Sequence, residues 1–435
     1  MSTAENMVNN KDLQRRLLFT LFCIAVFRFG IHIPTPGVNS EAVKMFFEKQ
    51  AGGLFGVFNT FTGGALNQFS VLALGIMPYI SSSIIFQLLS SMVPYLEALK
   101  KEGEPGRKKI QQYTRWGTIV LCVLQSYGLS NLLIGKEING QYLFNPQVGA
   151  IPLQLMTVVT LTAGTCFVMW LGEQITERGL GEGASVIIFA GIAANIPTGA
   201  FNLWNAVSSG QMSGLLALLL LAFMAFVLGC IIYFEVAQRR IPIHMSQKGA
   251  NRAPQMLGSY LPLKVNLCGV LPPIFAYAIL GFPATLATFS QAPWIQGLQQ
   301  QFSQTGALFN IFFVALVTFF SFFYTELMYP PNEMAENLKK AGKFIPGIRA
   351  GRSTSEYIQS VMERLNVAGS IYLCVICILP TILATQAAVP FFFGGTSVLI
   401  LVGVSLQLIE KINAYRYEAM IKTAQRPRRT RRVSF

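Results

Sequence analysis

Residues 214–234 read GLLALLLLAFMAFVLGCIIYF, a run of apolar and small side chains without one charged residue. A helix of about 20 such residues is long enough to cross the hydrocarbon core of a membrane, which is about 30 Å thick. The run therefore predicts a transmembrane helix.

The composition of the whole chain agrees with a membrane protein. Of its 435 residues, 52% are hydrophobic and 12% are charged, whereas ordinary soluble domains carry about 25% charged residues. So few charges cannot cover the surface of a soluble enzyme of this length. The 34 Phe, 14 Tyr and 4 Trp residues exclude a disordered chain as well.

Ten stretches of the chain are apolar over about the length that a membrane span needs. We expect a transmembrane helix in each of them, at residues 16–33, 71–92, 112–134, 151–172, 184–203, 213–236, 265–288, 306–329, 365–385 and 391–411. The weakest of the ten is 184–203, which glycines interrupt and which we expect to end at Pro197. The predicted fold class is therefore an all-α polytopic membrane protein.

The basic residues are distributed unevenly between the segments that connect these spans. The chain carries 33 Lys and Arg residues against 19 Asp and Glu residues, a net charge of +14. With ten spans, the segments rich in Lys and Arg all fall on one side of the membrane, at residues 11–16, 100–115, 178, 239–264, 339–364 and 411–432. Because loops rich in Lys and Arg stay in the cytoplasm, we expect both termini to be cytoplasmic.

Few residues of this chain suit enzymatic chemistry. The sequence contains no Walker loop and no HExxH motif, and its two histidines, His32 and His244, are far apart. Cys374 and Cys377 have the spacing of a metal or redox pair, but they lie in an apolar span without a second pair. We expect no enzymatic activity, no cofactor and no metal site, so a partner must supply the energy for any transport.

Two short motifs repeat between the halves of the chain. Residues 75–80 (GIMPYI) and 269–274 (GVLPPI) both read Gly–aliphatic–x–Pro–x–Ile near the start of a span, the second and the seventh. Two halves of five spans each must be inverted relative to one another, which is a common way to build a pathway between repeats. A chance similarity of six residues is the alternative.

Three further segments do not read as spans. FGVFNTFTGGALNQF (55–69) is half-apolar and too short to cross, so it is either a short re-entrant helix or an ordinary loop outside the membrane. The basic segments 237–264 and 330–364 read as flexible loops, which contact either lipid headgroups or a large acidic partner.

Six strings of the sequence, in this order, resemble the motifs of one protein family. They are VFRFGIHIPTPG (26–37), SVLALGIMPYISSSIIFQLL (70–89), WLGEQITERGLGEGASVIIFAGI (170–192), PLKVNLCGVLPPIF (262–275), ENLKKAGKFIPGIRAG (336–351) and PFFFGGTSVLI (390–400). They are similar to the SecY family of protein-conducting channels in its bacterial form. The resemblance covers nearly the whole chain apart from both termini.

The resemblance implies ten helices in two inverted halves around an hourglass pore. Such a channel passes unfolded secretory polypeptides across the bacterial inner membrane, and it opens a lateral gate to release transmembrane segments into lipid. The partners it implies are the SecE and SecG subunits, the SecA ATPase, translating ribosomes, signal sequences, unfolded preproteins and anionic phospholipid, with a membrane insertase as a further candidate. The division it implies is 1–203 for the first half, 204–411 for the second and 412–435 for a basic cytoplasmic tail.

The family motifs also assign site residues by position. The resemblance implies an aliphatic ring at the pore constriction, made of Ile76, Ile80, Ile188, Ile192, Ile274 and Ile400. It implies a plug at about 57–67, represented by Phe58, Asn59, Thr60, Phe61, Gly63, Gly64 and Leu66. It implies a lateral gate at Ser81, Ser82, Gln87, Asn266 and Phe282, between spans 2 and 3 and spans 7 and 8. It implies a docking surface for SecA and the ribosome at Arg239, Arg240, Lys248, Arg252, Lys264 and Arg349.

Two residues depart from the family pattern. Glu182 stands where the motif prefers a small polar residue such as Asn, and Ala350 replaces the Pro that often follows the docking arginine. The alternative function for the chain is a multi-pass secondary transporter, which would need ionisable pairs in the middle of the membrane.

Overall fold

The computed structural model describes residues 11–49, 54–134, 136–138, 141–144, 149–245, 259–287, 306–387 and 395–424. Ten long helices within these residues each overlap one predicted span, in the same order along the chain. Their bounds are α2 Lys11–Ile31, α5 Met77–Met92, α7 Glu104–Leu133, α8 Ala150–Arg178, α9 Gly183–Ser208, α10 Gly214–Val236, α11 Leu271–Ala287, α13 Ala307–Met328, α15 Arg352–Ala387 and α16 Gly395–Ala424.

Not all of these helices are long and apolar enough to cross a membrane by themselves. By length and composition, seven of the described helices meet that condition, and an eighth is obtained when α5 and α6 (Pro94–Lys101), bent by 96°, count as one span. The first turns of α2 are charged, and α11 is an apolar helix of the shorter class. The ten-helix layout agrees with the predicted fold class.

Two helices start later than the sequence predicts, and for the same reason. The second span was expected from residue 71 and the seventh from 265, but α5 begins at Met77 and α11 at Leu271. Gly75 (φ +55°) and Gly269 (φ +62°) precede these starts in the left-handed region, which turns the chain before the helix. Prolines follow within the first turn, where the missing N–H costs nothing. The repeated motif is thus a helix start in both halves.

The predicted end of the fifth span at Pro197 is wrong. Helix α9 continues through Pro197 to Ser208. A proline inside a helix removes one backbone hydrogen bond, but in a membrane the flanking residues still favour a helix because it pairs their own backbone groups.

The two basic segments form a folded unit. Strands β3 (Gln238–Met245) and β4 (Ser259–Lys264) make an antiparallel hairpin, and β5 (Lys343–Phe344) adds to β3. Helix α14 (Pro331–Lys340) and the start of α15 complete the unit, which has its own buried cluster around Ile241, Leu263 and Ile358. The prediction of flexible loops is therefore wrong for the described parts of these segments.

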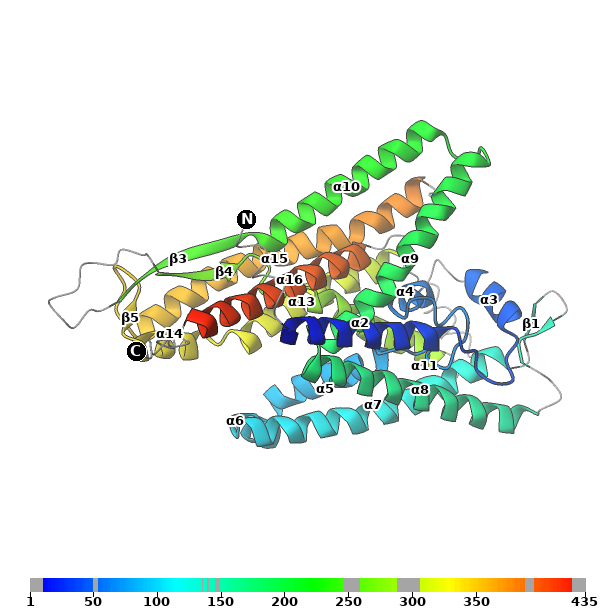
Figure 1. The fold of residues 1–435 in the computed structure, drawn as a ribbon, viewed down its shortest axis with the longest axis horizontal. Coiled ribbons are helices and arrows are strands. Elements are labelled where there is room, and N and C mark those ends of the chain that lie inside the picture. Colours follow the sequence, from blue (N-terminus) through cyan, green and yellow to red (C-terminus); the bar gives the residue numbers. More distant parts are fainter. Residues whose placement is uncertain are drawn as a thin grey trace, which may run out of the picture.

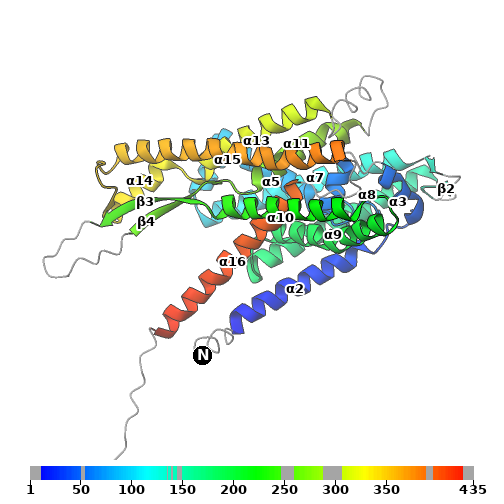
Figure 2. The same cartoon turned by 90° about the horizontal axis from the view of Figure 1, so that it is seen from above.

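These strands and α14 lie together at one end of the helix bundle, called the hairpin end below (Figures 1 and 2). Helix α3 (Ser40–Lys49) and the small hairpin of β1 (Glu137–Ile138) and β2 (Gln141–Tyr142) lie at the opposite end, called the α3 end. The long helices run between the two ends.

Within each half of the bundle, neighbouring helices in the sequence pack against one another. Helix α5 packs on α7, α7 on α8 and α8 on α9, whereas in the second half α11 packs on α13, α13 on α15 and α15 on α16. The halves meet where α9 contacts α16 and where α11 contacts α5 and α7. The largest apolar cluster among the described residues lies at this junction.

Candidate functional site

The six isoleucines of the expected ring meet in one buried cluster at the junction of the halves. Ile80 lies in α5 and Ile76 just before it, while Ile188 and Ile192 lie in α9, Ile274 in α11 and Ile400 in α16. Their exposed fractions range from 1% to 8%. A ring of branched apolar side chains has no hydrogen-bonding group to offer to water or ions, so it can exclude both.

A short segment closes this cluster from the α3 end. It begins with α4 (Leu54–Phe61) and continues in turns, so the helix is shorter than the expected plug at 57–67. The helix ends there because Gly63 and Gly64 adopt positive φ angles of +69° and +90°. We call residues 54–68 the plug segment.

The plug segment touches both halves of the bundle. The ring of Phe61, 2% exposed, lies edge-on to that of Tyr277 in α11, with centroids 6.2 Å apart. Phe58 is half-buried and lies against Gly281, also in α11. Leu66 belongs instead to a second apolar cluster, which α3, α7 and α8 share at the α3 end.

The backbone of the plug segment also packs closely against α9. A Cβ atom placed on Gly63 would lie 2.7 Å from the Cα atom of Gly191, and one placed on Gly191 would lie 2.8 Å from the carbonyl oxygen of Phe61. Gly191 directly precedes Ile192 of the ring. Two glycines therefore allow the plug segment to sit directly on the ring.

The plug segment is held together internally by its polar residues. The Asn59 side chain accepts a hydrogen bond from the Asn67 backbone N–H (3.0 Å), and the Thr60 hydroxyl donates to the Gly56 carbonyl (2.9 Å). The backbone N–H of Gly64 donates to the Asn59 carbonyl (2.9 Å). These bonds link residues 56–67 to one another.

The expected gate residues bond within their own halves. In the first half, the Ser82 hydroxyl donates to the Thr114 carbonyl of α7 (2.8 Å), and the Gln87 amide donates to the Ser83 hydroxyl (3.3 Å). Ser81 is half-buried on the same helix. Gln87 and Asn266, both assigned to the gate, do not bond to each other in the structure.

Asn266 has a partner that the sequence analysis missed. Its amide donates to the buried Glu235 carboxylate at the end of α10 (2.8 Å) and to the Gly269 carbonyl (3.1 Å). These bonds fix the turn from which α11 starts. Phe282 lies in α11, but its side chain is outside the described part of the structure.

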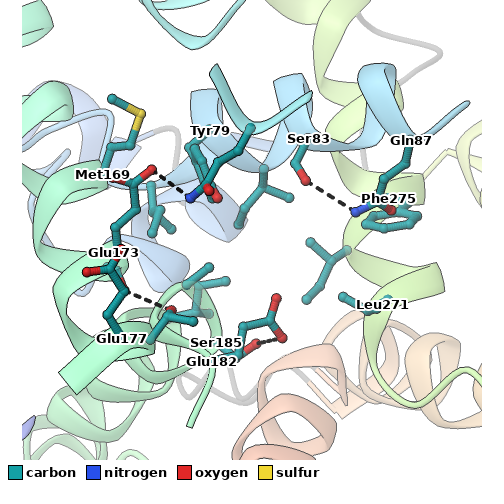
Figure 3. Close-up of a pocket in the computed structure, with 18 of the residues that line it drawn as sticks. Tyr79, Ser83, Gln87, Met169, Glu173, Glu177, Glu182, Ser185, Leu271 and Phe275 are labelled. Atoms are coloured by element: carbon teal, nitrogen blue, oxygen red, sulfur yellow. Dashed lines mark hydrogen bonds between the residues drawn. The ribbon is translucent and has the colours of Figure 1, made fainter. Parts of the chain in front are cut away.

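A cavity of about 300 Å³ lies on the side of the ring that faces the hairpin end. Ile76, Ile80, Ile188 and Ile274 of the ring form part of its wall. Glu173 and Glu177 lie on one side of the cavity, across from Gln87 and Phe275 (Figure 3).

The polar groups of this cavity are mostly paired. The Glu173 carboxylate accepts hydrogen bonds from Arg115 (2.7 Å) and Gln111 (3.2 Å), both in α7. Glu182, which departs from the family pattern, accepts one from Ser185 (3.3 Å) and lines the same cavity. The Gln87 side-chain oxygen is buried without a hydrogen-bond partner.

The described residues of the expected docking surface lie at the hairpin end. Arg239 and Arg240 are exposed on β3, where the Arg240 guanidinium lies 4.9 Å from the centre of the Tyr260 ring. Lys264 is ion-paired with Glu410 of α16 (2.7 Å). Arg349 is exposed in the turn before α15, and its carbonyl accepts a hydrogen bond from the Thr354 hydroxyl (2.8 Å). Lys248 and Arg252 lie outside the described residues.

The structure offers little to a metal or to covalent chemistry. Within the described residues, no group of three His, Cys, Asp or Glu side chains is placed to hold a metal ion. All seven cysteines are free thiols, buried or half-buried in the helix bundle.

Comparison with known proteins points to one family. A family model described as SecY matches residues 70–409. The protein is 43% identical over 431 residues to "Protein translocase subunit SecY" of Pseudomonas aeruginosa, covering 95% of this chain and 94% of the relative. It is 41% identical over 422 residues to the protein of the same name from Escherichia coli K12, covering 95% of each.

Solved structures share the fold at lower sequence identity. "The structure of a protein conducting channel" superposes with a TM-score of 0.71 at 17% identity, over 96% of both chains. "Sec61 in the Canine ribosome-channel complex from the endoplasmic reticulum" does so with a TM-score of 0.66 at 15% identity, also over 96% of both chains. With the family match over most of the chain and the sequence identity above 40%, these comparisons lead to one conclusion: the chain belongs to the SecY family.

Proposed function

We propose that this chain is the pore-forming subunit of a bacterial protein translocase. It passes unfolded secretory polypeptides across the inner membrane and releases transmembrane segments sideways into lipid. The observation that carries the proposal is the buried isoleucine ring, which helices of both halves supply and on which the plug segment sits.

The closed ring can block ions and still let an unfolded polypeptide pass. Branched aliphatic side chains dewet a narrow pore and block ions, yet they form no hydrogen bond that a moving polypeptide would have to break. The plug segment adds a second layer, and its internal hydrogen bonds let it leave as a unit.

The lateral gate lies between α5 and α7 on one side and α11 and α13 on the other. The hydrogen bonds of Ser82, Gln87 and Asn266 all stay within one half. A seam held by apolar contact between α5 and α11 can separate at low cost in lipid, because lipid tails replace those contacts. A hydrophobic signal sequence is the natural trigger.

The hairpin end is the cytoplasmic docking surface for a motor ATPase and the ribosome, with Arg349 as its central charge. Exposed arginines on β3 and before α15 suit acidic protein surfaces and RNA. Small SecE- and SecG-type subunits complete the channel, and anionic lipids contact its basic face. Both termini are cytoplasmic, and the halves are 1–203 and 204–411, joined by the short turn between α9 and α10.

A secondary transporter is the alternative. Such a protein needs ionisable groups paired along a transport path. Arg28 and Glu235 instead bond to a backbone carbonyl and an amide. That arrangement favours a structural use of both charges.

The ring is tested by ion conductance in planar bilayers with the purified translocase complex. The double variant Ile80→Gly and Ile274→Gly should raise the resting conductance severalfold, because it opens a hole in the seal. A matched control replaces two exposed isoleucines, Ile311 and Ile371, with Gly. Equal conductance of the ring variant and the wild type would contradict the proposal.

A further inference from the structure

Arg28 is a charged side chain in an unusual place. It lies three residues before the end of α2, between the buried residues Phe27 and Ile31. A guanidinium within an apolar span is costly unless it has a function or a partner. Among the described residues it forms no ion pair, so a carboxylate does not explain its position.

The partner of Arg28 is the plug segment. Its Nη1 atom donates a hydrogen bond to the Gly63 carbonyl at 3.0 Å. Within the described residues, this is the hydrogen bond that joins residues 54–68 to the rest of the protein, since their others stay within 54–70. Arg28 therefore holds a segment whose other contacts are apolar packing.

The chain that follows α2 is also bonded to the chain that follows the plug segment. The Thr35 N–H donates to the Phe69 carbonyl (3.0 Å), and the Val71 N–H donates to the Ile33 carbonyl (2.9 Å). These two bonds pair the chain after α2 with the chain after the plug segment. The chain after α2 thus supplies two backbone bonds next to residues 69–71, and α2 itself supplies the single side-chain bond to Gly63.

The position of Gly63 places this bond at the rim of the ring. Gly63 packs on Gly191, the neighbour of Ile192, and a Cβ atom on Gly63 would lie 2.9 Å from the Arg28 Nη1 atom. When the plug segment leaves, the guanidinium loses its acceptor and borders the vacated space. We propose that Arg28 is a latch for the closed state and, after opening, an unpaired positive charge in the pore wall.

This inference rests on the proposed function, and two conductance measurements test it. In the resting complex, Arg28→Gln should raise the conductance severalfold, whereas Arg28→Lys, which keeps a charged donor, should stay close to the wild type. Lys101→Gln, at an exposed ion pair of α6, is the control for loss of one positive charge.

The second measurement compares ion permeabilities in complexes that lack most of the plug segment. In complexes with residues 58–66 deleted, the ratio of chloride to potassium permeability should fall with Arg28→Gln and be retained with Arg28→Lys. A residue that only supports folding would not change this ratio. Arg28→Met, which suits an apolar helix, repeats the neutral variant if Arg28→Gln does not assemble.

The outcomes separate the inference from the proposed function. In one outcome the deletion opens an ion pathway, but Arg28→Gln and Arg28→Met change neither the resting conductance nor the permeability ratio. This outcome refutes the role of Arg28 and leaves the proposed channel function intact. If the deleted complex conducts no ions, the proposed function fails and the inference fails with it.

Discussion

At the scale of single residues, Gly63 and Gly191 determine how closely the plug segment packs against α9. Gly191 allows the backbone of the plug segment to approach α9 within van der Waals distance. Any larger residue at this position must displace either the helix or the plug segment. Of the two, the plug segment is the easier to move because its attachments are few.

We predict that Gly191→Ala loosens the closed channel. The added methyl group would meet the Phe61 carbonyl oxygen at 2.8 Å and the Gly63 nitrogen at 3.1 Å, so the plug segment must shift outward. Ion conductance of the resting complex should rise. Gly229→Ala in α10, where a Cβ atom meets nothing within 4 Å, is the control and should leave it unchanged. If the resting conductance of the Gly191→Ala complex equals that of the wild type, the contact between Gly191 and the plug segment does not contribute to the seal.

The hydrogen bond between Asn266 and Glu235 leads to a second prediction about single residues. Asn266→Leu removes the donor to a buried carboxylate, and an unsatisfied buried group costs about 1–3 kcal/mol. The complex should therefore unfold at a lower temperature, which tryptophan fluorescence can follow. The double variant Glu235→Leu and Asn266→Leu should cost less than the two single changes together. Strictly additive costs would show that the two side chains act independently.

The same change tests the gate. Because Asn266 fixes the turn before α11, Asn266→Leu should shift the hydrophobicity that a signal sequence needs to open the channel. Translocation of a series of signal sequences with graded leucine content measures this threshold. An unaltered threshold would remove Asn266 from the gate.

At the scale of elements, the sequence predicted the helices better than their ends. The apolar runs are long enough to place ten spans, because span length follows directly from membrane thickness. The starts of α5 and α11 depend on left-handed glycines, whose role becomes visible only with the backbone. The hairpin was missed although Ile241 and Ile243 alternate with exposed residues on β3, which is the period of a strand.

A further prediction concerns Arg349, in the proposed docking surface at the hairpin end. Arg349→Glu should reduce ATP-driven translocation by about tenfold or more, because charge reversal at a docking centre opposes an acidic partner. The side chain is exposed, so assembly and resting conductance should not change. Lys44→Glu, at an exposed position of α3 at the opposite end of the bundle, is the control and should leave translocation unchanged. Normal translocation by the Arg349→Glu complex in proteoliposomes would refute the docking role.

At the scale of the whole molecule, the site arises where two halves meet. The six isoleucines that the family motifs assign lie in one buried cluster of the folded chain, and their role as a pore ring stays a prediction. The contacts of Arg28 and Glu235 could not be predicted in this way. Their partners, Gly63 and Asn266, lie more than 30 residues away in the sequence, and only the packed structure pairs them.

The central claim is that a polypeptide passes through the isoleucine ring. Its most direct test places a photocrosslinking amino acid at Ile80, Ile188, Ile274 or Ile400, and in controls at the exposed Ile311 or Ile371. A secretory protein is then stalled during ATP-driven translocation. The account predicts crosslinks to the stalled chain from the four ring positions and none from the two controls. Crosslinks from the control positions alone, or from none of the six, would contradict it.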